Sequence, residues 1–125
     1  MQLNLLSSKL AAVHMDPSEP IPDWAKKGSF CSITITPTEM SIFCESGLVP
    51  EGIEKVDNWR AFQVDGQLDF GVTGIIAQLA VPLSAKQISI FSISTYDTDY
   101  MLVENRQLDG AIDVLKRAGH QINIL

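Results

Sequence analysis

The chain has 125 residues, 46% of them apolar, which is enough to build one compact domain or two very small ones. Nine basic residues stand against fifteen acidic ones, and the net charge of -6 disfavours nucleic acid and anionic membrane surfaces as partners. No apolar run approaches the ~20 residues that span a bilayer. The first residues alternate like a strand and do not read as a signal peptide. We therefore expect a cytoplasmic protein without a targeting segment.

The first quarter of the chain predicts strands joined by an irregular connection. Leu3–Met15 alternates as a strand does, with a turn or bulge at Ser7-Ser8. Three prolines follow, and Ile21–Lys27 is predicted to form a short helix, with Pro22 near its first turn and Gly28 just past its end.

A hairpin is predicted next, with strands at Ser29–Thr36 and Glu39–Glu45. In this register Cys31 lies opposite Cys44 on the apolar face. Free cysteine behaves as a small hydrophobe, so buried reduced thiols are the favoured interpretation and a disulfide is the alternative. There is no CxxC pair or Cys/His cluster, and we expect neither a metal site nor a cofactor.

The middle of the chain changes from loop to strand and then to helix. Ser46–Asn58 has the composition of a loop, and Trp59–Asp65 reads as a strand. The helix that follows has an apolar stripe at helical spacing, with Pro82 expected to kink or loosen its last turn. The residues of the stripe are Val72, Ile75, Ile76, Leu79, Ala80 and Leu83.

The last part of the chain predicts a second hairpin, a second helix and a final strand. The hairpin strands are Ile88–Thr95 and Tyr100–Glu104, and apolar residues on both faces of the first indicate that something covers its second face. The helix begins with Asn105 as its N-cap and ends at Gly119, and Gln121–Leu125 closes the chain.

From Trp59 onward this order is β-α-β-β-α-β, the ferredoxin-like motif. The first half repeats the plan in degenerate form. We therefore predict an α+β fold of two ferredoxin-like units that share antiparallel sheets with helices on one face. Their predicted bounds are 1–57 and 58–125.

Two polar segments could form a binding site. Residues 71–74, Gly-Val-Thr-Gly, precede the helix, where unpaired N–H groups and the helix dipole favour a carboxylate; a plain tight turn is the alternative. Asp97 and Asp99 lie in the turn of the second hairpin. We predict that Asp97 stabilises the turn and that Asp99 faces a ligand.

Catalysis has little support in the sequence. No hydroxyl residue lies in a GxSxG elbow, and neither His14 nor His120 has a recognisable partner. We interpret both histidines as structural and leave Lys9 and Arg60 out of the site. No catalytic residue is predicted, and the chain is expected not to be an enzyme.

The residues from Thr73 to Val103, TGIIAQLAVPLSAKQISIFSISTYDTDYMLV, resemble the ACT domain, with support from Trp59-Arg60 and Ala111–His120. This ferredoxin-like module binds amino acids and regulates enzymes of amino-acid metabolism. The subfamily it resembles occurs in the cytosolic arginine sensors of the TOR pathway and in aspartate-kinase-like regulatory regions.

The resemblance implies a ligand site at the junction of the helix start and the hairpin turn. Gly74 and Ile75 would offer backbone groups, Thr95 and Tyr96 backbone and side-chain contacts, and Asp99 a carboxylate for a cationic group. A comparable site would need a homodimer. The expected function is a tandem ACT protein that senses an amino acid and acts on a metabolic enzyme or regulator; a ligand-free interaction module or homodimeric scaffold is the alternative.

Overall fold

The computed structural model describes residues 1–66 and 73–125, so the Gly71-Val72 part of the helix-start motif lies outside the described residues. The chain divides into two compact units. Unit 1 comprises Met1–Ser7 and Arg60–Leu125, and unit 2 comprises Ser8–Trp59. The sequence placed the boundary at 57/58 and grouped the first seven residues with the N-terminal unit, whereas their contacts lie in unit 1.

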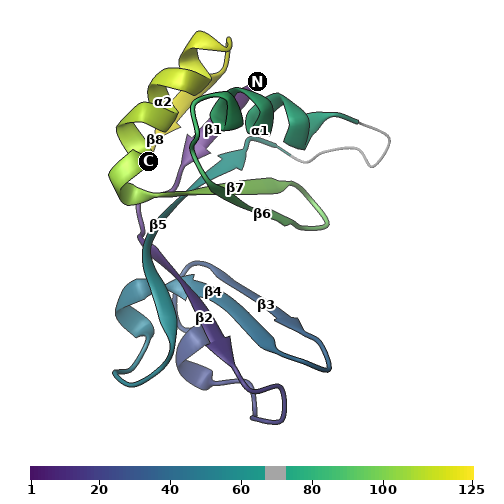
Figure 1. Ribbon diagram of the computed structural model, residues 1–125, viewed down its shortest axis with the longest axis vertical. Helices are drawn as coiled ribbons and strands as arrows, with labels where there is room; N and C mark the ends of the chain where they lie inside the picture. The colour runs from purple at the N-terminus through teal and green to yellow at the C-terminus, as the bar shows by residue number, and fades with distance from the viewer. Residues whose placement is uncertain (67–72) are drawn as a thin grey trace. The chain divides into compact units, whose positions relative to one another are not determined.

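Unit 2 is a small antiparallel sheet with two 3-10 turns (Figure 1). Its strand order is β3-β4-β2-β5, the order of a ferredoxin-like unit. Strand β5 begins in unit 2 and continues into unit 1 past Trp59. Its elements are β2 (Leu10–Met15), η1 (Asp23–Lys26), β3 (Cys31–Ile35), β4 (Met40–Glu45), η2 (Ser46–Leu48) and the start of β5 (Lys55–Val64).

Both connections of unit 2 differ from the prediction in detail. The helix predicted at Ile21–Lys27 is a single 3-10 turn, because Pro22 has extended backbone angles and the helix starts only after it. Strand β5 begins at Lys55, four residues before the predicted Trp59. Lys55 and Asp57 share one face of this strand and form an ion pair of 3.1 Å, so a loop-like composition is compatible with a strand here.

The predicted pairing of Cys31 with Cys44 in the β3–β4 hairpin is confirmed. The prediction that both thiols are buried is wrong for Cys31, which is exposed because β3 is the outermost strand of this unit. Both cysteines are free. Burial raises the pKa of the Cys44 thiol to about 11, so it is protonated and unreactive at neutral pH.

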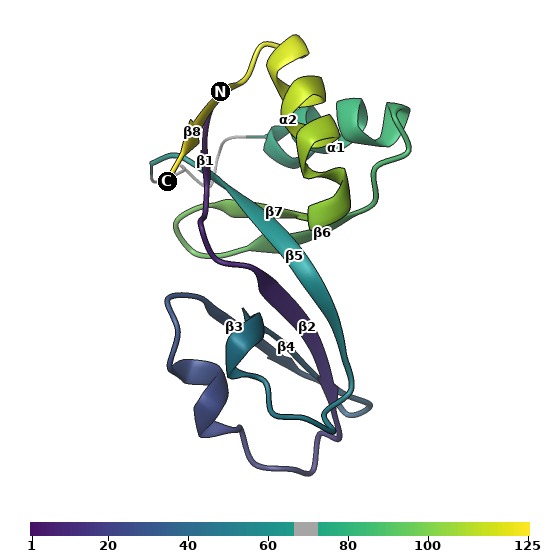
Figure 2. The same cartoon turned by 90° about the vertical axis from the view of Figure 1, so that its left-hand side faces the viewer.

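Unit 1 is a five-stranded sheet in the order β6-β7-β5-β1-β8, with two helices on one face (Figures 1 and 2). Its second helix, α2, is preceded by a 3-10 turn. The elements are β1 (Gln2–Leu5), the rest of β5, α1 (Ile75–Ala85), β6 (Ile90–Ser94), β7 (Asp99–Glu104), η3 (Asn105–Gln107), α2 (Leu108–Arg117) and β8 (Gln121–Ile124). The α+β, ferredoxin-type fold is confirmed.

The N-terminal strand β1 lies between β5 and β8, a position that no strand holds in a simple β-α-β-β-α-β unit. It pairs antiparallel with β5 and parallel with β8, whereas an antiparallel sheet was predicted. Leu3 and Leu5 project from it into the core and are buried. The first residues of the chain are therefore part of the core of unit 1.

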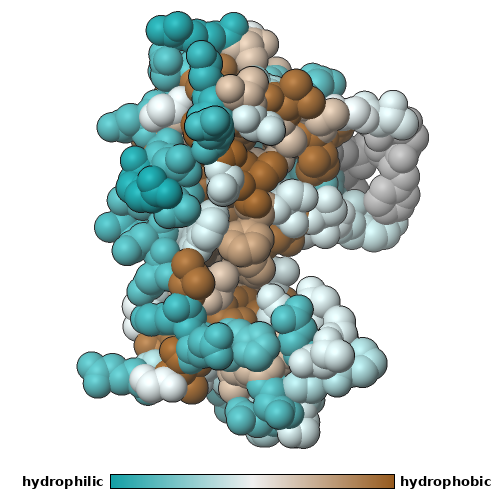
Figure 3. Space-filling view, in the orientation of Figure 1, coloured by the Kyte–Doolittle hydropathy of each residue, from teal (hydrophilic) through white to brown (hydrophobic). Residues whose placement is uncertain are grey.

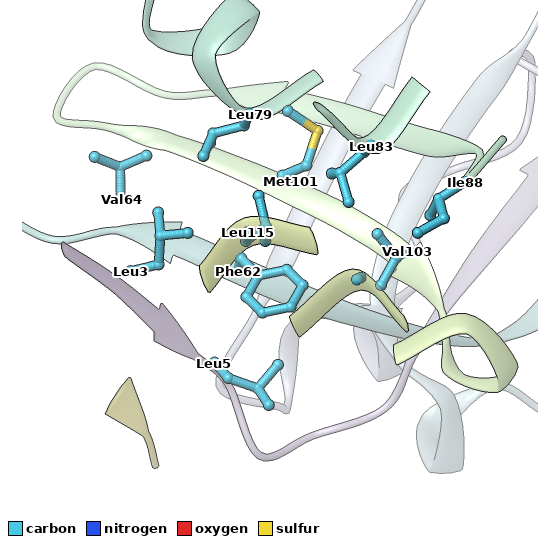
Figure 4. Packing of buried hydrophobic residues seen from close by; sticks show 11 residues of the cluster. Leu3, Leu5, Phe62, Val64, Leu79, Leu83, Ile88, Met101, Val103 and Leu115 are labelled. Carbon is cyan, nitrogen blue, oxygen red and sulfur yellow. The ribbon is translucent and has the colours of Figure 1, made fainter. Parts of the chain in front are cut away.

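The core of unit 1 forms between the sheet and the two helices (Figure 4). Phe62 from β5 is fully buried there with Leu115 from α2 and Met101 from β7. The described part of the predicted apolar stripe is confirmed, since Leu79 and Leu83 are buried and the other described members pack against them. Burial of a side chain of this size contributes about 1.5–3 kcal/mol.

Helix α1 continues through Pro82 to Ala85 although a loosened last turn was predicted. Proline lacks the N–H that would bond the carbonyl of Gln78. The buried His120 supplies a replacement, because its Nε2 lies 3.2 Å from that carbonyl oxygen. The N-terminal ammonium of Met1 lies 2.9 Å from Nδ1 and can only donate, so Nε2 carries the proton that Gln78 accepts.

Helix α2 begins later than predicted. Asn105 starts the 3-10 turn η3, and Gln107 occupies the N-cap position of α2 without a side-chain capping bond. The extra turn arises where the chain leaves β7, and Arg106 pairs there with Glu104 at 2.8 Å. At the other end Gly119 has a φ of 96°, which is the left-handed conformation expected after a helix C-terminus.

Candidate functional site

The helix-start part of the candidate site is formed by Gly74 and Ile75. Gly74 occupies the N-cap of α1 with a φ of 78°, a left-handed conformation that glycine adopts at little cost. The first helical bond runs from the Gln78 N–H to the Gly74 carbonyl at 3.0 Å. A glycine cap has no side chain to occupy the N–H groups of the first turn, beginning with that of Ile75. These groups and the helix dipole favour a carboxylate.

The hairpin turn between β6 and β7 is held by Thr95 and Thr98. The Thr95 N–H donates to the Thr98 carbonyl at 2.8 Å, and the Thr98 N–H donates to Oγ1 of Thr95 at 3.2 Å. Thr98 is itself buried, and its hydroxyl donates to the Val64 carbonyl at 2.7 Å. Since Val64 is the last residue of β5, this bond fixes the turn beside the end of that strand.

Thr98 is a residue that sequence reasoning missed. The available signal was the spacing of two threonines across a four-residue turn, which is typical of side-chain to backbone bonding. Such spacing does not reveal that one of the hydroxyls reaches another strand.

Asp99 and Tyr96 occupy different environments in this turn. The Asp99 carboxylate is half-buried, and its Oδ1 accepts a hydrogen bond of 2.6 Å from the Ser94 hydroxyl. A carboxylate has about four acceptor sites, so this bond leaves capacity for a cation while fixing its orientation. Tyr96 is 75% exposed.

Figures 1 and 2 show the turn and the N-terminus of α1 at the same end of unit 1. The structure thus brings all five predicted site residues, Gly74, Ile75, Thr95, Tyr96 and Asp99, to one end of the unit. That end combines N–H donors suited to a carboxylate with an oriented Asp99 carboxylate suited to an ammonium or guanidinium. These two groups are complementary to the two charges of a zwitterion.

The described residues give less support to a metal site or a catalytic histidine. No group of three His, Cys, Asp or Glu side chains in residues 1–66 and 73–125 could hold a metal ion. His14 lies 3.6 Å from Glu54 and 3.9 Å from Glu39 at an exposed surface. His120 is committed to Met1 and Gln78. Within the same residues, no helix is long and apolar enough to cross a membrane.

The surface of unit 1 exposes apolar side chains over α1 and the β6–β7 hairpin (Figure 3). Val81 of α1 is 66% exposed and Phe91 of β6 is 40% exposed. Ile88 and Ile90 of the opposite face pack into the core. The second face of β6 was predicted to be covered, and Phe91 remains partly accessible in the single chain.

Two family models match the chain. The model of the ACT domain matches residues 54–117, just over half of the chain. A second model, which describes an N-terminal domain, matches residues 9–52.

Several proteins of known structure or curated function are similar to the chain. A crystal structure of an Agobacterium tumefaciens protein has 35% identity and a TM-score of 0.94, covering 99% of this chain and 92% of that one. The regulatory subunit of aspartate kinase from Thermus thermophilus has the same fold at 10% identity, with a TM-score of 0.65 and coverage of 93% of this chain and 95% of that one.

The human cytosolic arginine sensor for mTORC1 subunit 1 is 43% identical over 60 residues. That match covers 47% of this chain and 18% of the sensor, so the chain matches less than a fifth of the length of this relative.

Proposed function

Since the chain belongs to the ACT domain family, we propose that it is a regulatory protein that binds an amino acid and performs no chemistry of its own. The observation that carries this proposal is the pairing of an uncapped helix start at Gly74 with the oriented carboxylate of Asp99 at one end of unit 1. The carboxylate of an amino acid would bind the N–H groups of α1. Its ammonium group, or a cationic side chain, would bind Asp99.

The similar proteins support an amino acid as the ligand class. One is named as an arginine sensor, and another is a regulatory subunit of aspartate kinase. The arginine sensor is also named as cytosolic, and we propose the same location for this chain. We further propose that the two units are tandem ACT domains, of which unit 2 is the degenerate one.

A homodimer would complete the site. Tyr96 in the hairpin turn and Phe91 in β6 present exposed aromatic surface, and an exposed apolar surface is typical of an interface. We propose that two copies pair through unit 1 and that this pairing covers Phe91. The regulated partner would be a metabolic enzyme or regulator.

A second candidate function uses the same exposed surface. Exposed Val81 and Phe91 would also suit a protein interaction module or homodimeric scaffold with an empty ligand site. The two candidates differ in one respect, because only the sensor gains stability from an amino acid.

Thermal denaturation with each of the twenty amino acids tests the proposal. A ligand present at a hundredfold excess over its Kd should stabilise the protein by about 2.7 kcal/mol. Asp99→Asn keeps the size of the side chain and removes its charge, so it should weaken binding of the ligand that is found. Asp109→Asn, on the exposed start of α2, is the matched control and should leave affinity unchanged. No stabilisation by any amino acid would favour the interaction module.

A further inference from the structure

Unit 1 contains a groove between the C-terminal end of α1 and the exposed side of α2, at the opposite end of α1 from Gly74. Both views of the ribbon show the segment that leaves α1 running beside α2 (Figures 1 and 2). The groove has a volume of about 690 Å³, within the range of about 300–1,000 Å³ that is usual for small-molecule sites. Since α1 has 11 residues, its two ends are about 16 Å apart.

The charge of the groove differs from that of the chain. Three of the nine basic residues line it, namely Lys86, Arg106 and Arg117. Arg106 pairs with Glu104 at 2.8 Å, and Arg117 pairs with Asp113 at 3.1 Å. Lys86 forms no ion pair with any residue that the structure describes. Three cations and two anions give these side chains a sum of +1 in a protein of net charge -6, and this favours an anionic ligand at Lys86. The C-terminal ends of α1 and α2 also border the groove and contribute partial negative charge, so the anion would bind at the side chain of Lys86 and not at the helix ends.

Gln107, which lines the groove, has a buried acceptor without a donor. Oε1 of Gln107 is inaccessible to solvent and accepts no hydrogen bond within residues 1–66 and 73–125. A buried polar atom in this state costs about 1–3 kcal/mol. Because this oxygen is inaccessible in the unliganded chain, the Gln107 side chain would have to turn toward the groove before a ligand N–H or O–H group could bond to it and remove that cost.

Gly110 is the third indication of a ligand. It lies in the first turn of α2, where glycine is less favourable than alanine, and it lines the groove. Among the residues that the structure describes, a Cβ atom at this position would meet the Cδ1 of Ile88 alone, at 4.0 Å, which is ordinary van der Waals contact. The packing of the described residues therefore does not require glycine. Its effect is to leave the groove open over the helix backbone.

From these three observations we propose that the groove is a second ligand site, which binds a small organic anion with an apolar body. The apolar body would lie on Pro82, Ile88 and Val114. The acidic group would bind Lys86 with help from Arg106. An N–H or O–H donor of the ligand would bond to Oε1 of Gln107. This site is independent of the site at Gly74.

Indole-3-acetate is a suitable probe, because it combines a carboxylate, an aromatic body and an N–H donor. Titration of the ¹⁵N-labelled full chain should give saturable shifts of the amides of Lys86, Ile88 and α2. Indole-3-acetamide has the same body and donor without the charge, so it should bind roughly fivefold more weakly or worse, corresponding to about 1 kcal/mol. Equal binding of the two probes would overturn the assignment of an anion.

Four variants locate the binding. Lys86→Glu should weaken the binding of indole-3-acetate, whereas Lys26→Glu, the same charge change in η1 of unit 2, should not. Gly110→Ala should raise the melting temperature and weaken binding, and Gly110→Met should abolish it. The proposal is overturned if no saturable shifts occur, if they occur at Gly74 and Thr95 instead, or if both lysine variants bind alike. Amino-acid binding at Gly74 would be unaffected by each of these results.

Discussion

The two units of the chain share a strand order except for β1, which is inserted between β5 and β8 of unit 1, and they differ in what connects the strands. In each, the order of elements follows a β-α-β-β-α-β plan, and β5 ends one unit and begins the other. Unit 1 has helices of 11 and 10 residues, whereas unit 2 has 3-10 turns of 4 and 3 residues. A 3-10 turn of this length has little dipole and few free N–H groups. A helix-start site for an anion is therefore available in unit 1 and not in unit 2.

Substitutions in the cores of the two units should have the largest effect on stability, and they test whether the units unfold separately. Leu3→Ala removes a fully buried side chain of unit 1, and Ile42→Ala does the same in unit 2. Each should lower the free energy of unfolding by about 2–5 kcal/mol, measured by urea denaturation. Because the two side chains belong to separate buried clusters, amide hydrogen exchange should accelerate mainly in the unit that carries the substitution. Equal acceleration in both units would show that they unfold as one.

The bond from His120 to Gln78 should have the next largest effect, and it replaces the backbone bond that Pro82 removes from α1. His120→Ala leaves the Gln78 carbonyl without its donor and should cost about 1–3 kcal/mol in urea denaturation. Pro82→Ala restores a backbone N–H for the same carbonyl. The cost of His120→Ala should therefore be smaller in the Pro82→Ala background, and a cost that is the same in both backgrounds would contradict this role of His120.

Gly74 should contribute to the stability of unit 1 through its backbone conformation. Gly74→Ala forces a side chain into the left-handed region and should cost about 1–2 kcal/mol. Apart from its chain neighbours, no atom of the described residues lies within 4 Å of the added Cβ, so the expected cost is conformational and not a clash. Gly74→Asn is the matched control, since asparagine tolerates this region better and should cost less in thermal denaturation. Equal losses for the two variants would argue against a conformational cause.

Glu45 should give unit 2 a small dependence on acid. Its Oε1 accepts bonds from the hydroxyls of Ser8 and Ser29 and from the Ser29 N–H, and the bonds to Ser29 are the main cause of its lowered pKa. The folded state therefore binds this proton less readily than the unfolded state. The stability that results is present above the ordinary glutamate pKa of 4.5 and is lost as the pH falls through the lower pKa of the folded state.

The test is urea denaturation between pH 3 and pH 6, a range chosen to span roughly the titration of carboxylates. Glu45→Gln should flatten the acid loss of stability. Gly28→Ala should have a similar effect, because its Cβ would lie 2.7 Å from the Glu45 carboxyl carbon and displace the side chain. An unchanged slope in Glu45→Gln would assign the acid dependence to other carboxylates.

Much of this fold could be predicted from the sequence because local pattern and tertiary packing agree there. The period-2 alternation around Cys31 and Cys44 determines the register of their hairpin, and the stripe containing Leu79 and Leu83 determines which side of α1 is buried. The ACT resemblance supplied what pattern could not, namely which end of unit 1 holds the candidate site.

The features that were not predicted depend on contacts between distant parts of the chain. The place of β1 between β5 and β8 depends on a parallel pairing across almost the whole chain. The hydrogen bond from His120 to the Gln78 carbonyl of α1 joins residues 42 apart, and the bond from Thr98 to Val64 joins residues 34 apart. Cys31 is exposed because β3 lies at the edge of its unit. The alternation of apolar and polar residues in a strand does not show whether that strand is at an edge. Local patterns contain no information on such partners.

The most direct test of the central claim is a ¹⁵N–¹H titration of the full chain with the twenty amino acids in pools. The account predicts that at least one amino acid gives saturable shifts at the amides of Gly74, Ile75, Thr95 and Tyr96, with those of unit 2 unchanged. Asp99→Asn should reduce the affinity for that amino acid. Shifts confined to unit 2, or no saturable shift with any amino acid, would contradict it.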